Sequence, residues 1–232
     1  MKLIYYIPIL TCSISIAFAV QLFRNWISKN DNAYMLWWFI GVVNFGVGTF
    51  TESFNSINGW TDFNFRLWYI SGALIGGTPL AQGTVYLILP KRIADILAYI
   101  FFGVAVFAAT AVLNSPIDYD QVDPIRMSGK VFEWQWIRGF TPFINIYALL
   151  FLAGGAIYSA VQYFRVKSPA EKVWGNILIA VGAILPGIGG TATRYGHIEW
   201  LYVTELAGLL MIFAGYLMMK KVPGPSIHEN QR

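Results

Sequence analysis

Long apolar runs separated by short charged connections occupy most of the sequence and limit the folds open to it. Seven runs reach roughly 20 residues, the length of a helix that crosses a hydrocarbon core about 30 Å thick. Because a backbone amide finds no partner in lipid, each run must form a helix that satisfies its own hydrogen bonds. The runs cover roughly residues 4–23, 34–52, 67–89, 93–113, 141–163, 174–193 and 201–219.

The composition agrees with a chain that lies largely inside a membrane. Only 12% of its residues are charged, 56% are hydrophobic, and the mean hydropathy is +0.54. A soluble domain of this length would carry far more charge on its surface. The runs also lack the alternation of apolar and polar residues that marks the strands of an outer-membrane barrel. The sequence therefore predicts an all-α integral membrane protein with seven transmembrane helices.

The distribution of charges predicts the orientation of these helices. The first, third and fifth connections and the C-terminal end are basic, with Arg24, Lys29, Lys91, Arg92, Arg165, Lys167, Lys172, Lys220 and Lys221. The second connection carries Asp62, and the fourth carries Asp118, Asp120, Asp123 and Glu133. The positive-inside rule then places the N-terminus outside and the C-terminus in the cytoplasm, in what we expect to be a prokaryotic-type plasma membrane. The net charge of +4 follows from this topology, so no nucleic-acid partner is expected.

An internal repeat divides the chain. Residues 19–24 (AVQLFR) recur 141 positions later as residues 160–165 (AVQYFR), and residues 48–52 (GTFTE) recur at nearly the same offset as residues 190–194 (GTATR). We interpret the two halves as diverged three-helix units in a parallel 3+1+3 pseudo-repeat, because an odd linker helix makes both units run the same way. The predicted divisions are a first repeat at 1–92, a linker helix with the outer connection at 93–140, a second repeat at 141–221 and a short cytoplasmic tail at 222–232.

Four charged residues at predicted outer helix ends form the main candidate site, because charges inside a membrane are costly and usually paired or functional. Glu52 and Arg66 flank the second connection, whereas Arg194 and Glu205 hold matching places in the second repeat. Glu205 lies about 7 Å below Trp200 if the helix starts there. We expect Glu52–Arg66 and Arg194–Glu205 ion pairs, or one four-member network. The network either locks neighbouring helices together or lines a pocket for a polar ligand.

A second set of polar residues lies within the apolar runs. Asn44, Gln82, Asn145 and Asn176 could line a polar path, or could simply form hydrogen bonds between helices. Glycines are concentrated in the third and sixth predicted helices. In the third helix Gly72 and Gly76 are spaced for close helix contact, and Pro79 is expected to kink it.

The sequence lacks the motifs of several common binding and catalytic sites. The sequence has no nucleotide-binding glycine loop and no hydrolase or metalloprotease motif. Cys12 is the single cysteine, and only two histidines are present. We therefore expect no catalytic residue, no metal site and no cofactor. The arrangement is similar in architecture to the SWEET sugar transporters and the microbial rhodopsins, but no motif of either family is present.

These features leave three functional interpretations. The first is a small-solute transporter with a polar site near the outer face, favoured by the parallel repeat. The alternatives are a seven-helix sensor that acts through a separate partner, and a non-catalytic subunit or assembly factor of a membrane complex. A central polar path would favour transport, whereas a closed outer pocket would favour sensing. A dry core with an apolar outer groove would favour the role of a subunit. The expected partners are the lipid bilayer, a small-molecule ligand, and another membrane protein or a second copy.

Overall fold

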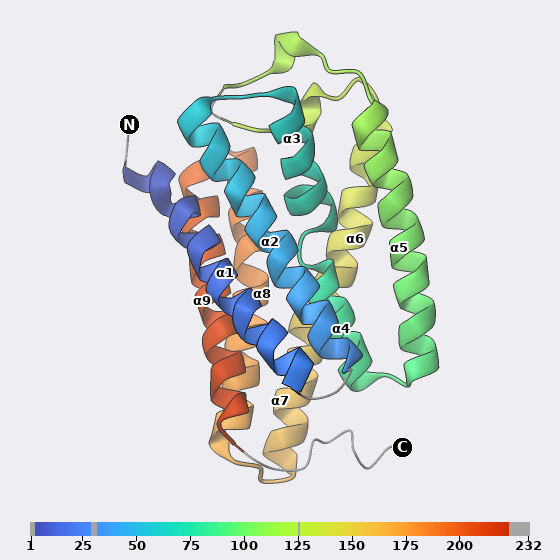
Figure 1. Cartoon of the computed structure of the whole chain (residues 1–232), viewed down its shortest axis with the longest axis vertical. Helices are drawn as coiled ribbons and strands as arrows, with labels where there is room; N and C mark the ends of the chain where they lie inside the picture. Colours follow the sequence, from blue (N-terminus) through green and yellow to red (C-terminus); the bar gives the residue numbers. More distant parts are fainter. Residues whose placement is uncertain (1–2, 29–31, 125, 223–232) are drawn as a thin grey trace.

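The computed structural model describes residues 3–28, 32–124 and 126–222, which form an elongated bundle of helices (Figure 1). The main helices, in chain order, are α1 (Ile7–Ser28), α2 (Ala33–Asn58), α3 (Asp62–Trp68), α4 (Thr78–Ile88), α5 (Lys91–Asn114), α6 (Phe140–Ala148), α7 (Gly155–Arg165), α8 (Ala170–Arg194) and α9 (Ile198–Lys220). Two π-helical segments, η2 (Tyr69–Ile75) and η6 (Leu149–Gly154), continue α3 and join α6 to α7. Short 3₁₀ turns are η1 (Leu3–Tyr6), η3 (Tyr119–Gln121), η4 (Gly129–Val131) and η5 (Gln135–Gly139). The predicted tail at 222–232 lies almost entirely outside the described residues.

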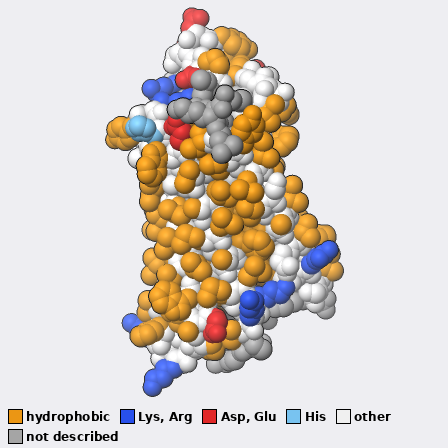
Figure 2. Space-filling view, turned by 90° about the vertical axis from the view of Figure 1, so that its left-hand side faces the viewer, with side chains coloured by type: hydrophobic (Ala, Val, Ile, Leu, Met, Phe, Trp, Pro, Cys, Tyr) orange, Lys and Arg blue, Asp and Glu red, His pale blue; other side chains and the backbone are white. Residues whose placement is uncertain are grey.

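Six helical segments are long and apolar enough to cross a membrane. They are Ile7–Ser28, Ala33–Asn58, Lys91–Asn114, Gln135–Arg165, Ala170–Thr193 and Ile198–Lys220. Each coincides with one of the predicted apolar runs, so the prediction of a multi-pass helical membrane protein is confirmed. On one side of the bundle, Figure 2 shows hydrophobic side chains over the middle and charged side chains mainly near the two ends. This is the surface pattern that a bilayer requires.

The predicted helix at 67–89 is discontinuous, which corrects the expectation of one unbroken span. The chain runs through α3 and η2, breaks at Gly76 and Gly77, and starts again as α4 (Figure 1). Gly76 has a φ of 47°, a left-handed conformation that glycine adopts without a steric penalty. Pro79 does not kink the middle of a helix as expected. It lies in the first turn of α4, where its missing amide costs no hydrogen bond.

Two asparagines from neighbouring helices bind the carbonyl groups around this break. The Asn44 side-chain amide donates to the carbonyl oxygens of Ser71 at 2.8 Å and Gly76 at 3.0 Å. From α6, the Asn145 amide donates to the carbonyl oxygen of Ala73 at 3.3 Å. A break inside a bundle leaves carbonyl groups without intrahelical donors, so these contacts offset its cost.

The apolar core has two parts. The larger cluster occupies the middle of the bundle and includes Phe18, Leu22, Met35, Trp38, Val42, Leu80, Ala81, Leu152, Ile179, Leu209, Ile212 and Tyr216. The smaller cluster, which contains Phe65, Tyr69, Val112, Phe132 and Ile137, lies beneath the long connection between α5 and α6.

The connection formed by residues 115–139 closes one end of the bundle, which we call the loop end (Figure 1). Its two arms are joined by backbone hydrogen bonds from Asp118 to Val131 at 2.8 Å and from Glu133 to Pro116 at 3.0 Å. The fully buried ring of Phe132 anchors it, with its centroid 5.0 Å from that of Phe65. The opposite end, where α4 meets α5 and where α9 finishes, is called the basic end.

Candidate ligand site at the loop end

Two carboxyl groups meet inside the loop end of the bundle. Glu52 lies near the end of α2 and is only 4% exposed, and Glu205 lies in the second turn of α9. Their side chains are joined by a hydrogen bond. An ionised carboxylate can only accept hydrogen bonds, so at least one member of the pair must hold a proton.

The hydrogen bonding of this pair is incomplete. The indole Nε1 of Trp68 donates to Glu52 Oε1 at 3.2 Å. Apart from the partner carboxyl group, no described residue hydrogen-bonds to Oε2 of Glu52 or to Oε2 of Glu205, although both atoms are buried. Buried polar atoms without a full set of partners are costly, and they are uncommon outside functional sites. Among the described residues, these two atoms therefore have capacity for a further hydrogen bond.

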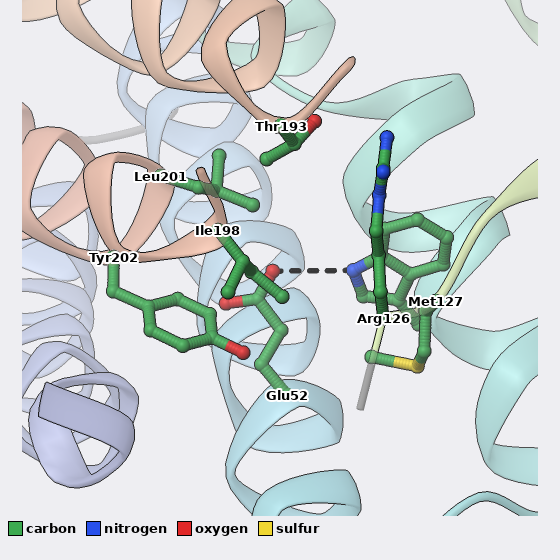
Figure 3. Close-up of a pocket in the computed structure, with 8 residues that line it drawn as sticks. Glu52, Arg126, Met127, Thr193, Ile198, Leu201 and Tyr202 are labelled. Atoms are coloured by element: carbon green, nitrogen blue, oxygen red, sulfur yellow. Dashed lines mark hydrogen bonds between the residues drawn. The ribbon is translucent and has the colours of Figure 1, made fainter. Parts of the chain in front are cut away.

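A small cavity lies directly beside Glu52. Its volume is about 50 Å³, which is room for a few water molecules or one small polar group. Five parts of the chain contribute to its walls, through Glu52, Trp68, Arg126, Met127, Thr193, Ile198, Leu201 and Tyr202. In Figure 3, the α9 residues Ile198, Leu201 and Tyr202 lie on one side of the Glu52 carboxylate, and Arg126 and Met127 lie on the other.

Arg66 has other partners than the predicted Glu52. It forms an ion pair with Asp62 one helical turn earlier, and its guanidinium also donates to the carbonyl oxygens of Val112 and, at 3.2 Å, Leu113. The nearby carboxylate at i−4 and the free carbonyls at the end of α5 offer more accessible partners than a buried glutamate. Arg66 therefore joins α3 to α5.

The predicted partner of Glu205 cannot be placed in the same way. Arg194 is the last residue of α8, but its side chain is outside the part of the structure that is described. The Arg194–Glu205 ion pair therefore stays a prediction. Its neighbour Thr193 lines the cavity, so the end of α8 does contribute to the site.

The four amide residues expected to line a polar path lie in three separate places. Asn44 and Asn145 bind the break between η2 and α4, as described above. Gln82 donates to the carbonyl oxygen of Ala94 at 2.9 Å and accepts a hydrogen bond from the hydroxyl of Tyr147. Asn176 donates to the carbonyl oxygen of Lys172 at 2.8 Å and to the sulfur of Met219 at 3.1 Å. Each of the four thus forms hydrogen bonds with backbone or side-chain atoms of other described residues, and none of them lines the cavity.

Apart from Glu52, the residues that line the cavity were not in the predicted charge network. Tyr202, Trp68 and Arg126 differ in how well the sequence indicates them. Tyr202 and Glu205 are three residues apart, a spacing that places them on one face of α9. Trp68 resembles an ordinary interfacial tryptophan in the sequence, and only the fold turns its indole toward Glu52. Arg126 lies in an irregular connection. The neighbouring Pro124 is held there by a hydrogen bond from the Asn55 side chain to its carbonyl oxygen at 3.3 Å.

Among the described residues, no group of three or more His, Cys, Asp or Glu side chains could hold a metal ion. Comparison with known proteins gives no relative from which to transfer a role, since the chain matches no family model and no curated protein. The argument for function therefore depends on the fold and the geometry of the cavity.

Proposed function

We propose that this protein is a membrane sensor that binds a small polar ligand in the loop-end cavity and passes the signal to a separate membrane partner. The observation that carries the proposal is the small cavity at one end of the bundle, lined by Glu52, whose Oε2 has no partner outside the Glu52–Glu205 pair among the described residues. A ligand bound there would contact α2, α8, α9 and the connection at the same time. We place the protein in a plasma membrane of prokaryotic type, with the loop end outside, as the sequence predicts.

The apolar packing below the cavity supports sensing over transport. Along α9, Leu209, Ile212 and Tyr216 follow Glu205 toward the basic end, and all three belong to the central apolar cluster. Along α2, Val42 and Trp38 occupy the corresponding place beyond Glu52. A transport path would need polar groups at this level. The polar residues within the apolar runs do not supply them, because those residues bind structural groups.

A small-solute transporter is the second candidate, and the discontinuous helix favours it. Transporters commonly bind substrate where a membrane helix is interrupted. We propose that the segment from Asp62 to Ile88 forms the seventh membrane crossing, with its break at Gly76 deep in the bundle. A break held by Asn44 and Asn145 is a place at which α3 and α4 could move relative to each other.

Cysteine accessibility separates the two candidates without knowledge of the ligand. In a Cys12→Ser background, we would introduce Thr193→Cys, a near-isosteric change in the wall of the cavity. A membrane-impermeant maleimide would then be applied to each side of oriented vesicles. A sensor with a one-sided cavity should be labelled from the loop side alone. A transporter that alternates between two open states should be labelled from both sides.

Two control variants report whether each side is reached. Tyr119→Cys lies in the connection at the loop end, where Tyr119 is 65% exposed, and Lys221→Cys lies at the exposed basic end. Labelling of Thr193→Cys from both sides would replace the sensor proposal by transport. Failure to label it from either side, with both controls labelled, would contradict both and favour the subunit interpretation.

A further inference from the structure

The loop-end cavity has an acidic and a basic side chain in its walls. Glu52 contributes a carboxyl group, which is hydrogen-bonded to that of Glu205. Arg126 contributes a guanidinium, which stays protonated in proteins. In Figure 3 the Arg126 guanidinium lies at the level of Thr193, displaced from the Glu52 carboxyl group. The two side chains therefore belong to different walls, one formed by helix α2 and the other by the connection.

Two aromatic side chains lie on the acidic side of the cavity. Trp68 and Tyr202 both line it, and Tyr202 is only 3% exposed. An ammonium group has up to three N–H donors, and Oε2 of Glu52 has no hydrogen-bond partner outside the acid pair among the described residues.

We propose that the ligand of this cavity is a small zwitterion that carries an ammonium group and an acid group a few bonds apart. Its ammonium group is received by Glu52, beside Trp68 and Tyr202, and its acid group by Arg126. The inference deepens the proposed function and rests on it. The same chemistry is found in a free amino-acid-like solute and in the headgroup of a zwitterionic lipid.

The two polar walls of the cavity select against simpler ligands. A plain cation would be repelled by Arg126, and a plain anion would leave the Glu52 carboxyl group without a donor. The repulsion is strong where water is largely excluded, since the local dielectric constant is low. A volume of about 50 Å³ further limits the ligand to roughly the size of a glycine molecule.

Calorimetric titration of the full-length protein tests this proposal. The protein would be placed in nanodiscs of phosphatidylglycerol, an anionic lipid without an ammonium group, and titrated with glycine, methylammonium and acetate. We expect glycine to bind, and each singly charged probe to bind about tenfold more weakly or not at all. Glu52→Gln and Arg126→Gln should each weaken glycine binding by about tenfold or more. Lys130→Gln, which removes an exposed cation from the same connection, should leave it unchanged.

A second set of nanodiscs distinguishes the two sources of the ligand. If a lipid headgroup occupies the site, phosphatidylethanolamine in the disc should weaken the binding of the free zwitterion by competition. Native mass spectrometry should then show a retained lipid that Arg126→Gln loses. If the affinity for the free zwitterion is the same in both lipids, the ligand is a free solute.

The outcomes separate this inference from the function on which it rests. Methylammonium binding as tightly as glycine, with no effect of Arg126→Gln, would overturn the zwitterion and leave a ligand-binding cavity. Acetate binding as tightly as glycine, with no effect of Glu52→Gln, would do the same from the other side. No binding of any probe, while Thr193→Cys is labelled from the loop side, would overturn the zwitterion alone. No binding together with no labelling would overturn both proposals.

Discussion

At the scale of single residues, two buried carboxyl groups in contact place a specific demand on their surroundings. Glu52 and Glu205 can stay hydrogen-bonded only while they share a proton, because two carboxylates at this distance repel each other. A glutamine at either position can donate the same hydrogen bond without a shared proton. A leucine cannot, and it would leave the other carboxyl group buried with fewer partners.

This difference gives a prediction for Glu205. Glu205→Leu should lower the free energy of unfolding by about 1–3 kcal/mol, whereas Glu205→Gln should change it by less than about 1 kcal/mol. Thermal unfolding of the detergent-solubilised protein would measure both effects. Glu171→Leu, at an exposed position in the first turn of α8, is the matched control and should be nearly neutral. Equal stability of the two Glu205 variants would mean that the carboxyl pair is not hydrogen-bonded in the folded protein.

At the scale of elements, the break between η2 and α4 depends on side chains from other helices. Asn44 supplies two of the hydrogen bonds that the broken helix lacks, and Asn145 supplies a longer third one. The break is thus a tertiary feature, in which α2 and α6 stabilise a conformation that the segment by itself would not hold.

We therefore expect Asn44→Ala to destabilise the protein by about 1–3 kcal/mol, because it leaves the carbonyls of Ser71 and Gly76 without these donors. Asn145→Ala should cost less, since only one bond of 3.3 Å is lost. Asn58→Ala, which removes only an exposed contact within α2, should have little effect in the same thermal unfolding assay. A cost for Asn44→Ala no larger than for Asn58→Ala would show that other contacts hold the break.

The pairing of α8 with α9 is a second feature of this scale. A Cβ atom added to Gly182 would lie 2.6 Å from the carbonyl oxygen of Gly208, so the two backbones are in direct contact. Gly187, on the same helix, has open space where a Cβ would be.

Gly182→Ala should accordingly destabilise the bundle by about 1–3 kcal/mol through overpacking. Gly187→Ala should be neutral or slightly stabilising, because alanine favours the helix more than glycine does. Both effects can be measured as shifts in the thermal unfolding midpoint. The interpretation would fail if the two substitutions shifted the midpoint equally.

At the scale of the whole molecule, the bundle separates a polar site from an apolar body. The cavity lies at the loop end, and the central apolar cluster fills the bundle below it. The exposed surface of α5 is strongly apolar, with Ile96, Tyr99, Ile100, Phe102 and Phe107 all more than half exposed, as expected for a helix that faces lipid. The accessibility of Tyr119→Cys and Lys221→Cys in intact cells would also test the predicted orientation. The division into two three-helix repeats stays a prediction of the sequence.

The sequence was sufficient for the features that depend on local composition. Six long helices and the membrane environment follow from the apolar runs, because lipid imposes its demand on every residue of a span. The importance of Glu52 and Glu205 also followed from this demand, since a carboxyl group inside an apolar run is costly wherever its partner lies. The ion pair of Arg66 with Asp62 was within reach of the sequence, because their i,i+4 spacing indicates it.

Only the tertiary structure decided which groups meet. Gly72 and Gly76 have the spacing of a packing face, and only the contacts of Asn44 and Asn145 with the neighbouring carbonyls show why the helix breaks there. The contact of Glu52 with Glu205, and the presence of Arg126 in the same cavity, join segments far apart in the chain. The physical reason is that the membrane fixes each helix through its own composition, whereas the choice of polar partners depends on which helix faces and loops the packed bundle brings together.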